Sequence, residues 1–190
     1  ADAIVAVSQW TKNLIVKHYG VPPEKVTVVH NGIDAGDYRP LPDRLTTLKR
    51  AGDKIVLFVG RITLQKGPDY FIRAAKRVLA LEPKTYFIIA GSGDMEGQTL
   101  REAAALGIAH RVIFTGFVLG AELDALYQSA DLYVLPSVSE PFGITPLESL
   151  VNGTPVIVSY QSGVAEVLRH ALKGDFWDTE ELANQIIAVL

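Results

Sequence analysis

The chain has 190 residues, 48% hydrophobic and 21% charged, a composition typical of a globular α/β protein. Its formal net charge of −3 argues against a nucleic-acid-binding protein, which would carry a basic stripe. The absence of cysteine excludes disulfides and thiol catalysis and fits a reducing compartment, so we expect a cytoplasmic protein. No apolar run approaches the roughly 20 residues of a membrane span. Membrane association is therefore not detectable, and peripheral attachment of a longer protein stays open.

Residues 1–34 predict a strand–helix–strand unit. An apolar run at 3–7 is typical of a strand, and Ser8 can cap the helix that follows. Gly20 is expected to end this helix, and a second apolar run at 26–30 predicts the second strand. The helix carries its apolar and aromatic side chains at Trp10, Leu14, Ile15 and Tyr19.

A larger domain is predicted from residue 55 to the end, after a polar, proline-containing linker at 35–54. Helical patterns separate its apolar runs, and this alternation predicts a Rossmann-like, doubly wound parallel α/β sheet. The chain begins at the edge of a strand and closes inside a helix, so we expect a piece of a longer protein. The predicted strands cover 55–59, 86–90, 112–114, 132–135, 155–158 and 171–175.

Two cations follow the first strand of this domain. Arg61 comes directly after Gly60, and Lys66 lies at the end of the same loop. A diphosphate needs compensating positive charge, and a guanidinium can bind phosphate through two parallel hydrogen bonds. Taken alone, the pair is better explained as solvated loop cations, because exposed Lys and Arg are common. The motif downstream favours the phosphate interpretation instead.

A glycine loop follows the second strand at 91–93. It lacks the dinucleotide fingerprint, because position 96, where that pattern needs glycine, is Glu. This weakens the alternative of an NAD-dependent oxidoreductase. Gly91 and Gly93 either let the backbone approach a ligand or form a tight turn, and both explanations stay open.

Two carboxylates, Glu140 and Glu148, lie at the junction between the fourth strand and the next helix. In a parallel sheet, ligands bind at the carboxyl ends of the strands. Gly143 lets the backbone come close to a ligand, and first-turn N–H groups can receive an anion. The alternatives are a capping acid with a surface acid, or the carboxylate pair of a glycoside hydrolase. Phosphate-binding cations on the same edge argue against a hydrolase.

The four histidines show no metal-ligand spacing, so no metal site is expected. Each histidine is better explained as structural or exposed. The segment Asn31-Gly32 is expected to be a hinge rather than a site.

In combination, these segments resemble the C-terminal, donor-binding half of a retaining glycosyltransferase of the GT-B fold. The resemblance is strongest to glycosyltransferase family 4, the glycosyl transferases group 1. It extends over nearly the whole chain, and the two carboxylates match the E-x7-E motif of the family. The matching segments are 28–34, 60–62 with 66–67, 91–93, 114–118, 140–148 and 152–157.

The resemblance implies a role for each matching residue. Arg61 and Lys66 would hold the donor diphosphate and stabilise the leaving group. Glu140 would contact hydroxyls of the transferred sugar, and Glu148 would bind the ribose hydroxyls. Backbone contacts to sugar and phosphate are implied at Phe142, Gly143 and Ile144.

Further donor contacts are implied around the nucleotide. Gly60, Gly91 and Gly93 belong to the loops near the phosphates, and Phe117 and Val118 to the strand beside the base. The donor would be a UDP- or GDP-linked sugar, with no cofactor besides this substrate. Transfer would retain the anomeric configuration through front-face attack, so neither glutamate needs to be a nucleophile.

The resemblance also implies a role for each part of the chain. Residues 1–34 would be the end of an N-terminal acceptor domain, 35–54 a linker, and 55–190 the nucleotide-sugar-binding domain. A sugar, lipid or other acceptor would bind through the missing domain, so we expect nucleotide binding but little transfer by this chain alone. The alternative is a non-catalytic nucleotide-sugar or phosphate-binding module. The segment 169–177 is less typical of the family, and no site residue is expected there.

Overall fold

The structure, a computed structural model, describes residues 1–34 and 52–190. Most of the predicted linker, 35–51, lies outside the described residues. Strand β3 (Lys54–Val59) begins one residue before the expected start of the larger domain. The division of the chain into domains stays a prediction.

The first 34 residues form the predicted strand–helix–strand unit. Strands β1 (Ile4–Ala6) and β2 (Val26–Val28) pair in parallel, with α1 (Gln9–Tyr19) and the short 3-10 helix η1 (Pro23–Lys25) between them. The Ser8 hydroxyl accepts a hydrogen bond from the Thr11 amide, and Gly20 ends α1 in the left-handed conformation at φ 63°.

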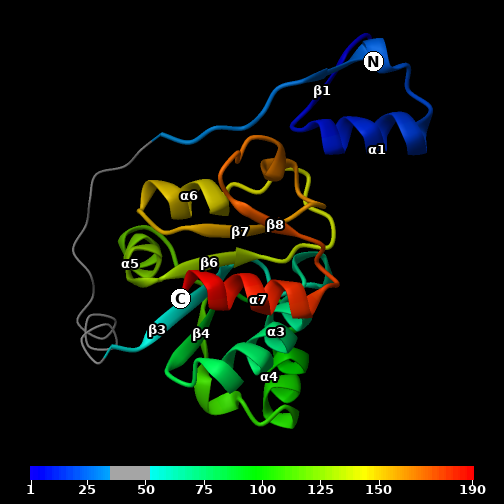
Figure 1. Cartoon of the computed structure of the whole chain (residues 1–190). Coiled ribbons are helices and arrows are strands. Elements are labelled where there is room, and N and C mark those ends of the chain that lie inside the picture. The colour runs from blue at the N-terminus through cyan, green and yellow to red at the C-terminus, as the bar shows by residue number, and fades with distance from the viewer. Residues whose placement is uncertain (35–51) are drawn as a thin grey trace.

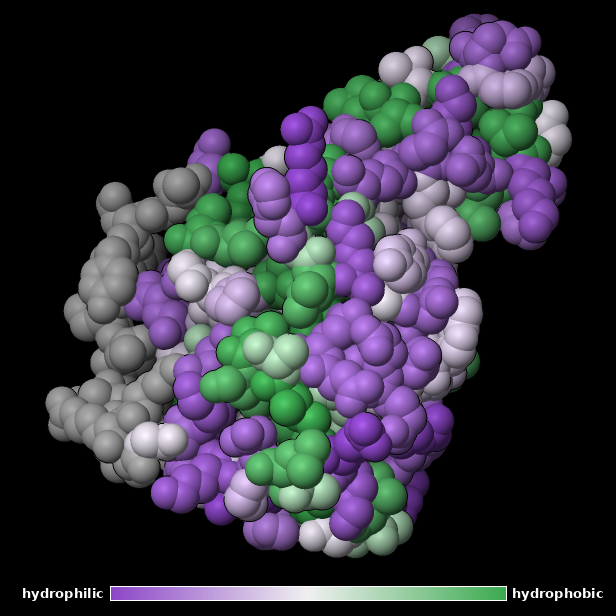
Figure 2. Space-filling view, viewed as in Figure 1, coloured by the Kyte–Doolittle hydropathy of each residue, from purple (hydrophilic) through white to green (hydrophobic). Residues whose placement is uncertain are grey.

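This unit lies apart from the larger sheet in Figure 1. No residue of α1 is fully buried: Trp10, Leu14 and Ile15 are half-buried, and Tyr19 is 81% exposed. Apolar side chains are visible on the surface of the unit in Figure 2, and Val5 and Val29 are both more than half exposed.

Residues 52–190 contain one six-stranded, wholly parallel sheet, as predicted. The spatial order is β5-β4-β3-β6-β7-β8, which is the doubly wound order with the reversal between β3 and β6. Each strand is short, and the middle ones are buried on both faces, as parallel strands require. Besides β3, the strands are β4 (Thr85–Ala90), β5 (Val112–Gly116), β6 (Leu132–Leu135), β7 (Val156–Ser159) and β8 (Leu172–Gly174).

Helices cover both faces of the sheet (Figure 1). One face carries α3 (Pro68–Leu81), α4 (Glu96–Ala105) and α7 (Thr179–Val189). The other carries α5 (Ala121–Ser129), α6 (Thr145–Val151) and the 3-10 helix η4 (Gly163–Glu166), where a short helix was expected. Two further 3-10 turns are η2 (Leu64–Lys66) and η3 (Ala109–Arg111). No helix within 1–34 or 52–190 has the length and apolar character needed to cross a bilayer.

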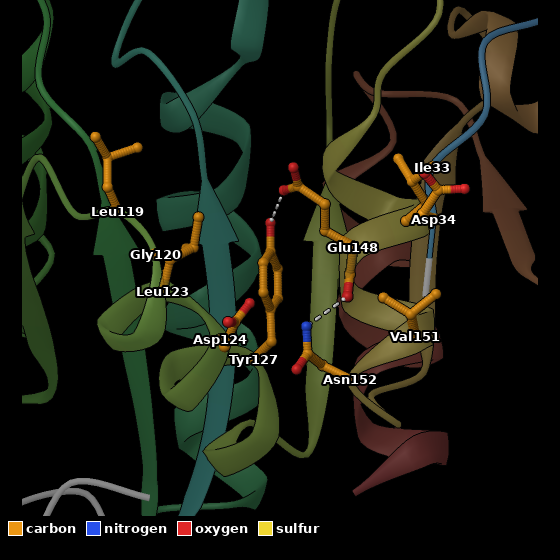
Figure 3. Close-up of a pocket in the computed structure, with 10 residues that line it drawn as sticks. All are labelled: Ile33, Asp34, Leu119, Gly120, Leu123, Asp124, Tyr127, Glu148, Val151 and Asn152. Atoms are coloured by element: carbon orange, nitrogen blue, oxygen red, sulfur yellow. Dashed lines mark hydrogen bonds between the residues drawn. The ribbon is translucent and has the colours of Figure 1, made fainter. Parts of the chain in front are cut away.

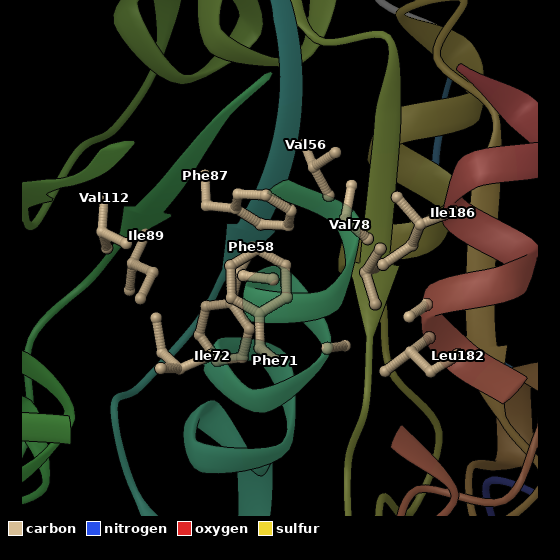
Figure 4. Packing of buried hydrophobic residues seen from close by; sticks show 14 of the residues in the cluster. Val56, Phe58, Phe71, Ile72, Val78, Phe87, Ile89, Val112, Leu182 and Ile186 are labelled. Atoms are coloured by element: carbon tan, nitrogen blue, oxygen red, sulfur yellow. The ribbon is translucent and has the colours of Figure 1, made fainter. Parts of the chain in front are cut away.

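Alternate residues of each strand enter the two cores, because successive side chains point to opposite faces. On the α3 side, the rings of Phe58, Phe71 and Phe87 meet with centroids 5.6 and 5.4 Å apart (Figure 4). Leu182 and Ile186 of α7 join this core. The two cores hold the strands in place, and the loops that follow these strands lie at the carboxyl edge of the sheet.

Candidate functional site

Lys66 and Glu140 meet at the point where the strand order reverses. Lys66 follows β3 and Glu140 follows β6, and these two strands are neighbours in the sheet. The Lys66 ammonium donates to the Glu140 carboxylate, and the two side chains are only 13% and 11% exposed. The sequence predicted both residues for the site, and the fold brings them into direct contact.

The loop of Lys66 is tied to the loop of Glu140 by a second residue. The side-chain amide of Gln65 donates to the Ser139 carbonyl at 2.9 Å. The backbone carbonyl of Gln65 accepts from the Val138 amide, also at 2.9 Å. Arg61 lies on the exposed side of this loop, with its guanidinium 3.5 Å from the Gln65 side-chain oxygen. The exposed guanidinium is therefore free to turn toward an anion.

Gly91 and Gly93 pack against the backbone of the loop that begins at Gly60. A Cβ on Gly91 would lie 1.9 Å from the Gly60 carbonyl oxygen, and one on Gly93 would lie 2.3 Å from that of Ile62. Backbone hydrogen bonds join the two loops, with the Ile62 amide donating to Ser92. The need for glycine at both positions thus follows from contact between the loops, and their part in donor binding stays a prediction.

Glu148 lies in the first turn of α6, about where the sequence placed it. Its carboxylate accepts a hydrogen bond from the Tyr127 hydroxyl at 2.9 Å. Burial raises the pKa of Tyr127 well above its usual range, and the nearby Tyr133 and Glu148 raise it further. Tyr127 is therefore a neutral donor that orients the Glu148 carboxylate.

A pocket of about 350 Å³ opens beside Glu148 (Figure 3). It lies between α5 and α6, and residues 33–34 of the N-terminal segment reach its rim. Asn152 closes one side and donates to the Glu148 carbonyl at 3.0 Å. Its walls mix carboxylates with aliphatic side chains, namely Ile33, Asp34, Leu119, Gly120, Leu123, Asp124, Tyr127, Glu148, Val151 and Asn152.

The remaining predicted site residues lie in two places. Phe142 and Gly143 are buried two and three residues after Glu140, and Ile144 is 41% exposed just before α6. After β5, the side chain of Phe117 is 73% exposed and that of Val118 is buried. Neither Phe117 nor Val118 lines the pocket beside Glu148, although Leu119 does.

Glu166 and His30 form a contact near the site, and the sequence predicts neither as a site residue. Their side chains are hydrogen-bonded at 3.0 Å, and the His30 ring lies 6.0 Å from that of Phe142. No local pattern reveals this contact, because 136 residues separate the pair. Within the described ranges, no cluster of three or more His, Asp or Glu side chains could hold a metal.

Comparison with family models assigns the chain to a known class. The model described as glycosyl transferases group 1 matches residues 43–190, and that described as glycosyltransferase family 4 matches residues 1–37. The chain therefore belongs to the glycosyl transferases group 1, and its parallel sheet is the Rossmann-like half of a GT-B fold.

Individual relatives agree with this assignment. An uncharacterized glycosyltransferase of Methanocaldococcus jannaschii is 39% identical over 178 residues, which is 90% of this chain and 45% of the relative. A D-inositol 3-phosphate glycosyltransferase of Rhodococcus jostii is 35% identical over 98% of this chain and 44% of its own. The crystal structure of Anabaena HepE with UDP-glucose has a TM-score of 0.86 and 25% identity, covering 99% of this chain and 54% of that one. The chain thus spans about half the length of these three proteins.

Proposed function

We propose that this chain is the donor-binding side of a retaining glycosyltransferase that takes its sugar from a UDP- or GDP-linked donor. The observation that carries the proposal is the Lys66–Glu140 contact at the strand-order reversal. In doubly wound sheets this position is where ligands bind. The UDP-glucose in the similar Anabaena structure supports a nucleotide-sugar donor.

Arg61 and Lys66 would neutralise the donor diphosphate. Lys66 is held in place by Glu140, whereas Arg61 is exposed and has room to close on the phosphates. When the bond between sugar and diphosphate breaks, negative charge grows on the departing oxygen. Cations beside that oxygen stabilise this charge in the transition state more than in the bound donor, which is the basis of their catalytic effect.

Glu140 would accept hydrogen bonds from hydroxyls of the transferred sugar, and Glu148 from hydroxyls of the ribose. Carboxylates suit this task because each offers several acceptor sites. The pocket beside Glu148 would hold the nucleoside, with Phe117, Val118 and the backbone of 142–144 contributing further donor contacts. The acceptor hydroxyl would then attack the anomeric carbon from the face that the diphosphate leaves, and the departing phosphate oxygen would take the hydroxyl proton. This step needs no enzyme nucleophile and retains the anomeric configuration.

The acceptor would bind through a separate N-terminal domain, of which residues 1–34 form the last part. On this proposal the 190-residue chain binds nucleotide but transfers little by itself. A cytoplasmic location, with peripheral contact to a membrane through the longer protein, fits a sugar or lipid acceptor. No cofactor or metal is proposed.

Calorimetry with UDP and GDP tests the donor site. We expect one of the two to bind the wild-type chain, and Arg61→Ala to weaken that binding roughly ten- to a hundredfold, the effect of losing a charge-assisted hydrogen bond. Arg101→Ala, on the exposed surface of α4, is the matched control and should bind as the wild type does. If neither nucleotide binds at millimolar concentration, the site assignment fails.

Activity distinguishes the enzyme from a non-catalytic binding module. A protein extended to include the N-terminal domain should release UDP or GDP from the donor in the presence of acceptor, and Lys66→Ala should abolish this. The anomeric configuration of the product, read by NMR, tests retention. Nucleotide binding without turnover by the extended protein would favour the binding module.

A further inference from the structure

The N-terminal unit rests on the loop that carries Glu140. The Ser8 hydroxyl donates to the Pro141 carbonyl at 2.5 Å, and the Thr11 hydroxyl donates to the same oxygen at 3.0 Å. Ser8 is fully buried. The residue that caps α1 therefore also binds the residue next to Glu140 in the chain.

Glu166 of η4 binds the N-terminal end of the same helix. Its carboxylate accepts from the backbone amides of Gln9 at 2.8 Å and Trp10 at 2.6 Å, and from the His30 ring at 3.0 Å. First-turn amides have no partner within a helix, and the helix dipole favours a negative charge there. One carboxylate thus binds both the start of α1 and the segment after β2.

Backbone hydrogen bonds join η4 to the Glu140 loop. The Gly163 amide donates to the Glu140 carbonyl at 3.0 Å, and the Val164 amide to that of Phe142 at 2.7 Å. A Cβ on Gly163 would lie 2.3 Å from the Pro141 carbonyl oxygen and 2.4 Å from the Ser8 Cβ, so the Pro141 backbone and the Ser8 side chain leave no room for a side chain at Gly163. The chain of contacts runs from α1 through Glu166 and η4 to the Glu140 loop, and returns to α1 through Ser8.

We propose that Glu166 and Ser8 are positioning residues, which hold the Glu140 loop in its donor-binding geometry by clamping the N-terminal unit against it. This inference rests on the proposed function, because the benefit of the clamp is a correctly placed Glu140. The N-terminal unit then supports the donor site from outside, because the proposed phosphate-binding residues, Arg61 and Lys66, both lie in the larger domain. A shift of this unit is transmitted to Glu140 through Pro141.

Two measurements on the 190-residue chain test the clamp. The first is amide hydrogen exchange at Gly163 and Val164, which needs no ligand. The second is UDP affinity by calorimetry. Glu166→Ala should accelerate exchange at both amides roughly tenfold and weaken UDP binding to a similar degree, as expected for losing about 1.4 kcal/mol of capping. Glu166→Gln keeps an acceptor oxygen but loses the charge, so it should fall between the wild type and Glu166→Ala.

The controls separate the clamp from general stability. Glu24→Gln changes an exposed acid of the same unit, away from the junction, and should leave both readouts unchanged. Ser8→Ala removes the hydrogen bond between α1 and the Pro141 carbonyl. It replaces Glu166→Ala in both measurements if that variant does not fold. Faster exchange in α1 alone, with wild-type exchange at Gly163 and Val164, would overturn the clamp and leave Glu166 a simple helix cap. If the wild type does not bind UDP or GDP, the proposed function fails, while hydrogen exchange still decides the clamp.

Discussion

The ammonium of Lys66 contacts the carboxylate of Glu140 across the reversal of strand order, and neither side chain is more than 13% exposed. An ion pair buried to this extent gains little net stability, because removing two charges from water offsets their attraction. Each partner nevertheless depends on the other, since one alone would be a buried, uncompensated charge. The arrangement is therefore explained better by binding than by folding.

We expect Lys66→Ala to lower the free energy of unfolding by about 3–5 kcal/mol, because Glu140 would lose its counter-charge. The double variant Lys66→Met, Glu140→Leu should recover most of this loss, since it removes both charges and fills the space. Denaturant unfolding measures the stability, and calorimetry with UDP measures binding. A double variant that still bound UDP as the wild type does would contradict the assigned roles of the pair.

Tyr127→Phe removes the hydroxyl that orients Glu148. We expect it to cost about 1.5–3 kcal/mol of stability, as for a hydrogen bond to a charged group, and to weaken nucleotide binding. Tyr133→Phe is the matched control. Tyr133 is buried on the same face, but its hydroxyl pairs with Thr145 instead, at 2.7 Å, so its loss should affect nucleotide binding less. Equal losses of affinity in the two variants would show that Glu148 needs no orientation by Tyr127.

Gly91→Ala should destabilise the protein by about 1–3 kcal/mol or more, because its Cβ would collide with the Gly60 carbonyl. The backbone at Gly91, with φ 144°, adds strain for any other residue. Gly97→Ala provides the contrast. Gly97 lies in the first turn of α4 with only ordinary contact to Arg101, so alanine there should stabilise by up to about 1 kcal/mol. Thermal unfolding of both variants measures the difference.

Stability should depend on the ionisation of Glu166. Burial raises the pKa of this carboxyl, but the hydrogen bonds from His30, Gln9 and Trp10 outweigh it and hold the pKa below its usual value of 4.5. A depressed pKa in the folded state contributes stability that is present above pH 4.5 and is lost as the pH falls through the folded value. The stability difference between wild type and Glu166→Gln should therefore shrink on acidification from about pH 6 to pH 3. A difference that stayed constant over this range would contradict the lowered pKa.

Local patterns predicted most of the fold. The Ser8 cap, the Gly20 stop and all six strands of the large sheet lie within one or two residues of their expected positions. Such features depend on side-chain periodicity and on turn residues, which act over a few positions. The four apolar or aromatic residues expected on α1 differ in burial, since Trp10, Leu14 and Ile15 are half-buried and Tyr19 is exposed. Periodicity shows which residues share a face but not what covers it.

The sequence by itself determined the order of strands and helices, because hydrophobic runs and the breaks between them mark these elements. It also placed four residues after strand ends, namely Arg61, Lys66, Glu140 and Glu148. Only the tertiary structure decided which strand ends are neighbours. Lys66 reaches Glu140 across 74 residues because β6 adds next to β3 rather than beside β5. Glu166 reaches the amide of Trp10 across 156 residues through a helix end that no local pattern pairs with it. Contacts of this kind depend on how whole elements pack, and that packing is set by the complete core rather than by any single stretch of residues.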